Sequence, residues 1–341
     1  MNTKVTLKDV AKEAGVSYQT VSKVLRGQIK VTPDTQVRIE TAVTKLGYRP
    51  NTAARNLRTQ SSNLIGYGWL QGGDDSPHPV LNHFLYSAVQ RAEQNDFHLL
   101  TFLIEENIEK TIAIYRELYA RRQVEGFILA DTNDNDPRIN FLMEANIPFA
   151  CFGRANDDWD FCWVDVDGSN GMEQVTAHLQ QQGHTKIGLI TWPEGSRAGE
   201  ERENGYFKQM TQAGLPVHSD WIVRGENRVQ VGYQLLSQLL TLPEADRPTA
   251  VACVSDQIAI GAMNAALAQG LQVGANFAIT GYDNLPMSEF LFPPLTTVQQ
   301  PIREAGDLVI EKLLQQINSE SISEKQTLLK PKLIIRKSSE A

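Results

Sequence analysis

The sequence contains only three cysteines, Cys151, Cys162 and Cys253, and they lie far apart in a chain of 341 residues. An odd number of separated thiols does not build a disulfide framework, which favours a reducing compartment. No run of about 18 apolar residues is present, so no segment is expected to span a membrane. The N-terminus also lacks an apolar signal core. We therefore expect a cytoplasmic protein with no membrane partner.

Patterns typical of enzymes and metal sites are also missing. The six histidines show no metal-ligand spacing, and neither a GxxxxGK[ST] phosphate loop nor a Gly-x-Ser-x-Gly elbow occurs. Residues 66–72 resemble a dinucleotide-binding fingerprint after a strand, but the third glycine is one place late. The side chains of Trp69 and Leu70 would also crowd a pyrophosphate there. The sequence therefore indicates no enzyme, no metal site and no cofactor.

The charge is divided unevenly along the chain. The whole protein has a net charge of −8, which is unusual for a protein that binds nucleic acid. Residues 1–60, however, contain eleven basic and four acidic side chains, whereas the remainder contains 21 basic and 36 acidic ones. A basic head on an acidic body is expected when one small domain contacts phosphates. Chance clustering on a solvated face is the alternative explanation.

The basic head is predicted to form three short helices, each begun by a Ser or Thr N-cap and ended by a glycine. They cover residues 7–14, 18–26 and 33–46, with N-caps Thr6, Ser17 and Thr32 and terminal glycines Gly15, Gly27 and Gly47. In the first helix the apolar side chains recur with helical spacing and form one buried stripe. Two short helices joined by a tight turn that contains glycine form a helix-turn-helix.

The second of these helices, residues 18–26, is the expected recognition helix. Val21, Val24 and Leu25 are expected to pack inward. The outward face would then carry polar side chains that can bind base edges and phosphates. These outward residues are Tyr18, Gln19, Ser22 and Lys23. A helical bundle that binds no DNA is the alternative.

Residues 50–61 are expected to form a hinge. Pro50 breaks the chain, Asn51 can cap a helix, and residues 52–58 can make about two helical turns. This segment has almost no apolar face and is too short to be stable alone, so we expect it to fold on binding. Leu57 lies among polar residues, a position suited to a wedge between base pairs in the minor groove.

From Asn63 the sequence alternates buried strands with amphipathic helices. Strands are expected at 64–68, 98–104, 126–130, 148–152, 187–192, 250–254 and 277–282, and helices at 84–95, 109–121, 171–182, 202–213 and 258–269. Such alternation predicts parallel sheets covered by helices on both faces, and the length suits two lobes. Ligands in such sheets bind beyond the carboxyl ends of the strands, so a cleft between the lobes is the expected ligand site.

A small polar ligand with neighbouring hydroxyls can be held by an arginine and a carboxylate near the strand ends. Arg202 and Asp283 are the first candidates, with a purely structural salt bridge as the alternative. The further polar candidates are Arg154, Ser255 and Asp256, and the aromatic candidates for stacking on a sugar ring are Trp69, Phe84 and Trp192. Aromatic side chains in such proteins are more often core residues.

Residues 5–59 resemble the head and hinge of the lac repressor family of bacterial regulators. The matching residues are Val5-Thr6-Leu7, Asp9-Val10-Ala11, the runs 14–22 and 47–51, and Ala54, Arg55 and Leu57. The resemblance implies a DNA-binding set of Thr6, Ser17, Tyr18, Gln19, Thr20, Ser22, Lys23, Asn51, Ala54, Leu57 and Arg58. Lys23 stands where the family's namesake has arginine, and a point charge replaces a planar fork there. The operator sequence therefore does not follow from the resemblance.

The body is similar to the family's two-lobe effector domain, which resembles periplasmic sugar-binding proteins. The matching segments are 183–187, 202–206, 255–263, 281–284 and 294–298, the last being the strand that crosses back to the first lobe. The implied fold is an all-α helix-turn-helix head at 1–49, a hinge at 50–61, and an α/β two-lobe periplasmic-binding-protein-like effector and dimerisation domain at 62–341. The first lobe is expected at 62–162 and 292–320, and the second at 163–291 and 321–341.

The resemblance implies a transcriptional repressor of carbohydrate-utilisation genes that a sugar or sugar derivative releases from a palindromic double-stranded operator. A co-repressed regulator of a non-sugar metabolite is the alternative. Ser255 stands where the family's namesake has asparagine, so the sugar stays open. No leucine-rich heptad tail follows residue 337, so a homodimer is expected rather than a tetramer. A periplasmic binding module is the rival for the body, and the basic head argues against it.

Overall fold

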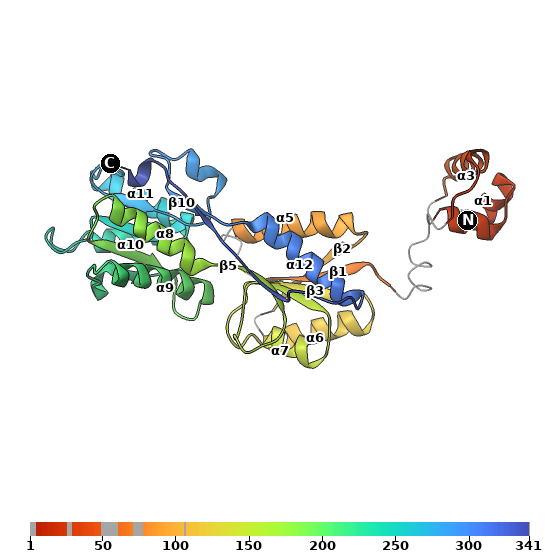
Figure 1. Ribbon diagram of the computed structural model, residues 1–341, viewed down its shortest axis with the longest axis horizontal. Helices are drawn as coiled ribbons and strands as arrows, with labels where there is room; N and C mark the ends of the chain where they lie inside the picture. Colours follow the sequence, from red (N-terminus) through yellow and green to blue (C-terminus); the bar gives the residue numbers. More distant parts are fainter. Residues whose placement is uncertain (1–4, 26–28, 49–60, 71–77, 106, 341) are drawn as a thin grey trace. The chain divides into compact units, whose positions relative to one another are not determined.

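The computed structural model describes residues 5–25, 29–48, 61–70, 78–105 and 107–340. Contacts divide the chain into two units, Met1–Ser62 and Asn63–Ala341, which are considered separately (Figure 1). No helix among the described residues is long and apolar enough to cross a membrane. The three cysteine thiols are buried, and none of them is in a disulfide.

The first unit contains the helices α1 (Leu7–Ala14), α2 (Tyr18–Val24) and α3 (Pro33–Leu46). Their N-caps act as the sequence predicts, since the Ser17 hydroxyl accepts the Thr20 amide at 3.0 Å and the Thr32 hydroxyl accepts the Thr35 amide at 3.4 Å. Gly15 and Gly47 end α1 and α3 in the left-handed conformation, at φ of 64° and 61°. The core of this unit consists of Val10, Ala11, Ala14, Val21, Val24, Ile39 and Ala42.

The sequence assigns two residues of α2 to the wrong face of the helix. Ser22 is only 6% exposed and therefore does not lie on the outward face, whereas Leu25 is 39% exposed and does not pack inward. Ser22 is small and lies in the middle of the helix, between the buried Val21 and Val24. Leu25 is the C-cap of α2, beyond the last residue that packs against the other helices. The predicted hinge contacts Asn51, Ala54, Leu57 and Arg58 lie outside the described residues.

The second unit begins with a six-stranded sheet in which every strand pair is parallel. Its order is β11 (Gln326–Leu329), β5 (Cys162–Val166), β4 (Phe149–Phe152), β3 (Gly126–Ala130), β1 (Leu64–Leu70) and β2 (His98–Ile104). Helices α5 (Pro79–Gln94) and α12 (Ile302–Ile317) cover one face, and α6 (Ile108–Ala120) and α7 (Pro137–Glu144) cover the other (Figure 1). We call this layered body the first lobe.

The second lobe is built around a four-stranded parallel sheet. Its strands in order are β7 (Ile222–Arg224), β6 (Ile187–Thr191), β8 (Ala250–Cys253) and β9 (Ala278–Thr280). Helices α8 (Gly168–Gln181) and α9 (Arg197–Gln212) pack together, as do α10 (Val229–Leu239) and α11 (Asp256–Ala268). Strands β10 (Thr297–Gln299) and β12 (Lys332–Ile334) form a small antiparallel sheet. Short 3-10 helices occur at Ser219–Trp221, Pro286–Glu289 and Lys337–Ser339. The two-lobe α/β fold expected from the alternation is confirmed.

The predicted boundaries between the lobes need correction. Strands β5 and β11 pair within the six-stranded sheet, so residues 163–166 and 326–329 belong to the first lobe rather than the second. Residues 294–298 do not yet return to the first lobe, because Leu295 and Val298 pack in the core of the second and β10 pairs with β12. The chain crosses between the lobes in extended segments. Alternating apolar residues in such a segment do not show which sheet it joins.

Candidate functional sites

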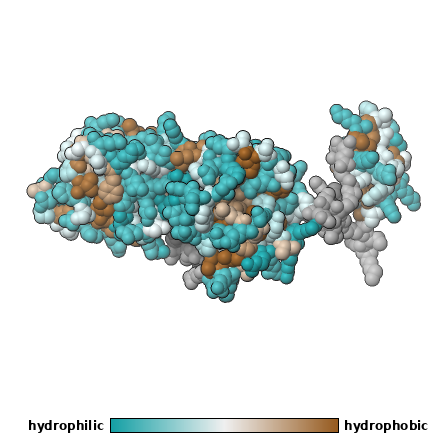
Figure 2. All heavy atoms as spheres, turned by 60° about the horizontal axis from the view of Figure 1, so that its bottom comes forward, coloured by the Kyte–Doolittle hydropathy of each residue, from teal (hydrophilic) through white to brown (hydrophobic). Residues whose placement is uncertain are grey.

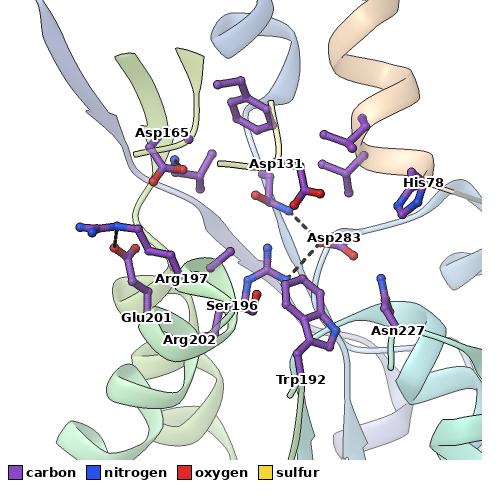
Figure 3. A pocket seen from close by; sticks show the side chains of 18 of the residues that line it. His78, Asp131, Asp165, Trp192, Ser196, Arg197, Glu201, Arg202, Asn227 and Asp283 are labelled. Carbon is purple, nitrogen blue, oxygen red and sulfur yellow. Dashed lines mark hydrogen bonds and ion pairs between the residues drawn. The ribbon is translucent and has the colours of Figure 1, made fainter. Parts of the chain in front are cut away.

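A cavity of about 280 Å³ lies between the two lobes, beyond the carboxyl ends of their strands (Figure 3). Its first-lobe walls include Asp131 after β3, Arg154 after β4 and Asp165 on β5. From the second lobe come residues of α9 and of the segments that follow β6, β7 and β9, with Gln257 at the start of α11: Trp192, Ser196, Arg197, Glu201, Arg202, Asn227, Gln257 and Asp283. The predicted position of the ligand site, at strand ends between two lobes, agrees with this cavity.

Arg202 and Asp283 form a buried ion pair at this cavity, with 3.6 Å between Nη1 and Oδ1. The Arg202 Nη1 also donates to the Val254 carbonyl at 2.5 Å. The guanidinium lies 3.9 Å from the centroid of the Tyr282 ring and 4.9 Å from that of Trp192. Two aromatic rings and a carboxylate therefore fix the plane of this guanidinium; Figure 3 shows it beside Trp192 and Asp283.

The backbone of Asp283 is strained, with φ at 118°, a conformation that L-residues seldom adopt. Its amide donates to the Val298 carbonyl at 2.9 Å, and its carboxylate accepts the Gln300 side-chain amide at 2.7 Å. Burial raises the pKa of Asp283 to about 7, although the nearby Arg202 opposes this shift. The carboxylate is thus held in place by Gln300 and Arg202 and titrates near neutral pH.

Arg154 connects carboxylates of both lobes. Its Nε donates to Asp165 of the first lobe at 2.9 Å, and its Nη2 pairs with Glu201 on α9 of the second lobe. Burial raises the pKa of Asp165 and of Glu201, and the charge of Arg154 acts in the opposite direction on both. The guanidinium also lies 5.5 Å from the centroid of the Trp163 ring.

Arg197, in the first turn of α9, also connects the lobes. Its guanidinium pairs with Asp134 and Asp157 of the first lobe, at 2.6 Å for Asp157, and with Glu201 on its own helix at 3.4 Å. The Arg197 amide donates to the Asn133 side chain at 3.0 Å. Desolvation by burial is the largest single influence on the pKa of Arg197 and lowers it. The carboxylates together outweigh it, so the pKa is raised above its usual value.

The structure brings four of the eight predicted ligand-binding residues together around the cavity: Arg154, Trp192, Arg202 and Asp283. Trp69 lines a neighbouring cavity of about 20 Å³. Phe84 is wholly buried, and its ring stacks on that of Phe152 with 4.7 Å between centroids, so it is a core residue.

Ser255 and Asp256 do not line the cavity, contrary to the prediction. Ser255 is the N-cap of α11 and donates to Asn227 Oδ1 at 2.5 Å. Asp256 is fully buried and accepts hydrogen bonds from residues of the segment that follows β9, and burial raises its pKa to about 6. Both residues begin a helix, and polar groups at that position bond to the protein itself.

Several polar residues at the cavity were missed by the sequence reasoning. They are Asp131, Asp165, Ser196, Arg197, Glu201, Asn227, Gln257 and Gln300. The strand-end rule that selected Asp283 also applies to Asp131, which directly follows β3. Arg197 and Glu201 share one face of α9 because they are four residues apart, and Glu201 directly precedes Arg202. Among the described residues, no group of three His, Cys, Asp or Glu side chains is placed to hold a metal ion.

The candidate nucleic-acid interface is the outer face of α2 in the first unit. Tyr18, Gln19 and Lys23 are exposed there, as the sequence predicts. Ser17 and Thr20 share a hydrogen bond of 2.8 Å between their hydroxyls at the N-terminus of the helix. Thr6 is exposed and donates its hydroxyl to Asp9 Oδ2 at 2.7 Å, which lowers the pKa of Asp9. An exposed amide, phenol and ammonium on one short helix can reach base edges and phosphates.

Two family models match the chain. "Bacterial regulatory proteins, lacI family" matches residues 6–51, and "Periplasmic binding protein-like domain" matches residues 176–339. The chain is 30% identical to a probable transcriptional repressor, ExuR, of Bacillus subtilis, with 98% of both chains covered. It is 31% identical to the repressor PurR of Actinobacillus pleuropneumoniae, again with 98% of both covered. The regulator AglR of Rhizobium meliloti is 32% identical over 98% of this chain and 94% of its own length.

Solved structures give the same result. The lac repressor dimer bound to operator and the anti-inducer ONPF is 29% identical, with a TM-score of 0.84 over 99% of this chain and all of that one. A LacI-family regulatory protein from Chloroflexus aggregans is 43% identical, with a TM-score of 0.77 over 82% of this chain and 99% of that one. The regulator CelR in complex with cellobiose is 26% identical, with a TM-score of 0.74 over 98% and 99%.

Proposed function

Because the chain belongs to the lacI family of bacterial regulatory proteins, and the relatives described above are transcriptional regulators rather than enzymes, we propose that a small sugar or sugar derivative controls its binding to operator DNA. The effector binds in the cavity between the lobes, and the regulated genes serve carbohydrate use. The protein acts in the cytoplasm, on the nucleoid when it is bound to its operator. A co-repressed regulator of a non-sugar metabolite is the second candidate.

The observation that carries the proposal is the Arg202–Asp283 pair at the cavity, with both groups fixed by their neighbours. An arginine and a carboxylate side by side can bind adjacent hydroxyls with charge-assisted hydrogen bonds. The buried Arg202 Nε and Trp192 Nε1 have no acceptor among the described residues. A ligand rich in oxygen can supply acceptors once the cleft rearranges around it. Among the similar structures, CelR is in complex with cellobiose, a sugar.

The repressor is proposed to act as a homodimer on a near-palindromic operator, because two heads related by two-fold symmetry read symmetric half-sites. Three apolar side chains are exposed on the helix Pro286–Glu289 and in the segment that follows it: Met287 at 52%, Phe290 at 79% and Phe292 at 92%. Figure 2 shows a mostly hydrophilic face on which hydrophobic side chains gather in separate patches. Large exposed aromatics close together in a chain are typical of an interface, and a second copy of the chain is their proposed partner.

Effector binding is proposed to change how the lobes meet and thereby the state of the hinge at residues 50–61. A coupling of about 1–3 kcal/mol between the two sites would weaken operator binding about 5- to 150-fold. The sign of this coupling separates the two candidates. Addition of an inducing sugar should lower operator affinity, whereas a co-repressor should raise it.

The test begins with selection of duplexes from a random pool by the full chain. Fluorescence anisotropy at constant salt then compares a selected palindrome with a scrambled duplex. We expect a clear preference for the palindrome, and Gln19→Ala should reduce discrimination between operator variants by about 1–3 kcal/mol. A thermal-shift screen of mono- and disaccharides identifies ligands, and each hit is added to the operator complex. No preference for any duplex, with or without ligand, would exclude the proposed function.

A further inference from the structure

The charges around the cavity are unequal in number. Four carboxylates line it, those of Asp131, Asp165, Glu201 and Asp283, against the three guanidiniums of Arg154, Arg197 and Arg202. Each guanidinium already has at least one carboxylate partner, and Arg197 has two more outside the lining. No arginine at the cavity is therefore left without a negative partner in the part of the chain that the structure describes.

Asp131 is the carboxylate in excess. It is exposed to solvent, and the ion pairs formed by the described residues do not include it. Figure 3 shows it at the cavity in the view between Asp165 and His78. The other three lining carboxylates equal the three guanidiniums in number, so the carboxylate of Asp131 gives the lining its negative balance.

The backbone that carries Asp131 is fixed from behind. Asp131 follows β3 in the left-handed conformation, with φ at 53°, and its carbonyl accepts Arg138 Nη2 at 2.9 Å. Arg138 is itself buried and pairs with Asp136 at 2.5 Å. The next residue, Thr132, donates its hydroxyl to the Arg154 carbonyl at 2.8 Å, which ties the end of β3 to the end of β4. The backbone at Asp131 is thus held rigidly, although the carboxylate projects into solvent.

A ligand carboxylate or phosphate would meet Asp131 without any unpaired arginine to balance it. Like charges closer together than the Debye length, about 8 Å at physiological ionic strength, repel one another even where solvent reaches them. A ligand hydroxyl, by contrast, donates to a carboxylate in a charge-assisted hydrogen bond. The excess charge therefore favours a neutral ligand with many hydroxyls over its acidic derivatives.

We infer that the effector is an uncharged polyhydroxylated molecule, and that Asp131 is the residue that accepts one of its hydroxyls and discriminates against uronic acids and sugar phosphates. This inference rests on the proposed function, because it describes the ligand of the same cavity. Asp131 determines specificity, whereas Arg138 and Asp136 are positioning residues for it.

Isothermal titration calorimetry of the full chain tests the inference with matched ligands. The panel contains glucose, galactose, maltose and cellobiose, with glucuronate, galacturonate and the 6-phosphates of the two hexoses as acidic counterparts. All titrations are made at about pH 8 and at the same salt concentration. We expect a neutral sugar to bind and its acidic counterpart to bind at least about tenfold more weakly. A rise in salt should narrow that gap, because salt screens the repulsion.

Asp131→Asn keeps the size of the side chain and removes its charge. The affinity for the neutral sugar should fall about tenfold as the charge-assisted bond is lost, and the preference for it over the acid should fall about fivefold. Asp158→Asn, an exposed carboxylate change away from the cavity, is the matched control and should alter neither quantity. If Asp131→Asn weakens neutral and acidic ligands by the same factor, Asp131 is not a specificity residue and the inference is overturned.

The other outcomes separate this inference from the proposed function. An acidic sugar that binds the wild type more tightly than its neutral parent overturns the inference, while release of the operator by that acid would keep the proposed regulator. A panel in which no sugar of either kind binds overturns the inference and the sugar effector together. Operator binding, measured separately by anisotropy, tests the repressor itself in every case.

Discussion

Asp256 shows how a residue selected as a ligand contact serves the fold instead. Its carboxylate accepts the Leu285 amide at 2.7 Å and the hydroxyls of Ser288 and Thr297, each at 2.5 Å. These donors come from the segment after β9 and from β10, so one buried carboxylate at the start of α11 fastens the connection that leaves the second lobe. Above about pH 6 it is charged and accepts all three bonds.

The change Asp256→Ala is therefore expected to destabilise the fold. It leaves three buried donors without their acceptor, and each such group costs about 1–3 kcal/mol, so we expect a loss of roughly 3 kcal/mol in the free energy of unfolding. Urea unfolding at about pH 8, followed by circular dichroism, measures the loss. The exposed change Asp158→Asn should stay within about 0.5 kcal/mol of the wild type. An equally small effect of Asp256→Ala would contradict the fastening role.

Asp283 gives a prediction on pH, because burial raises its pKa to about 7. As the pH falls through this value the carboxylate takes up a proton, loses its charge opposite Arg202 and becomes a weaker acceptor for ligand hydroxyls. We expect effector affinity to fall as the pH drops from about 8 to about 6, as measured by calorimetry with a neutral sugar identified in the screen.

Variants assign this pH dependence to one group. Asp283→Asn should bind weakly at all pH values with no change across this range. His78→Gln removes the imidazole at the cavity and should keep the wild-type dependence. A dependence that disappears in His78→Gln and persists in Asp283→Asn would show that the histidine is responsible.

The single-residue predictions succeeded where position along the chain is enough. Asp283 lies three residues after β9, and the strand-end rule placed it at the cavity, whereas Arg202 reaches the same cavity from the second turn of α9. Phe84 was misplaced because helical spacing does not show that its ring stacks on Phe152 in the core. Arg197 was missed because its partners, Asp134 and Asp157, lie in the other lobe, and pairing across the cleft leaves no local pattern in the sequence.

At the scale of elements, the first turn of α9 is a bridge between the lobes. Arg197 is mostly buried, whereas Asp134 and Asp157 are exposed, so a single such pair is expected to contribute little. Arg197, however, holds three carboxylates at once, and Arg154 pairs with Glu201 beside it. A charged network of this kind holds the lobes together at low salt and weakens as salt screens it.

The expected result of Arg197→Ala is a wider distribution of distances between the lobes. Spin labels on cysteines substituted at Ala113 of α6 and Gln234 of α10 report that distance by double electron–electron resonance. The distance distribution of the wild type should widen when the salt concentration rises from about 0.05 M to about 0.5 M. That of Arg197→Ala should already be wide at low salt. Arg121→Ala removes an exposed arginine that pairs with Glu117 in the same lobe, and should resemble the wild type. Identical distributions in all samples would exclude a bridging role.

Helices whose ends are marked by N-caps and glycines could be predicted from the sequence. The lobe of a strand that is defined by pairing with a distant segment could not. α1 and α3 were found from Thr6, Thr32, Gly15 and Gly47, because caps and left-handed glycines act on adjacent residues. β5 and β11 were not assigned to the first lobe, since only the pairing of β5 with β4 and of β11 with β5 places them there. β12, at 332–334, follows β11 closely yet pairs with β10 beside the other sheet.

At the scale of the whole molecule, the proposed dimer depends on the exposed apolar segment 287–292. Phe292 is the most exposed aromatic residue of this segment. The change Phe292→Asp places a charge where a second copy would bury apolar surface. We therefore expect Phe292→Asp to sediment as a monomer at micromolar concentration while keeping the fold of each lobe. The control Val217→Asp changes an exposed apolar residue between α9 and β7 and should stay dimeric.

The loss of the dimer should also separate two modes of DNA binding. In a dimer the second head binds its half-site at a high effective concentration, which strengthens full-operator binding by about 10²- to 10⁴-fold over one head. Phe292→Asp should lose that gain on a full palindrome and bind a single half-site as the wild type does. Because the substitution lies in the second lobe, far along the chain from α2, unequal half-site affinities would show that it disturbs more than assembly. A variant that remains dimeric would place the interface on another surface.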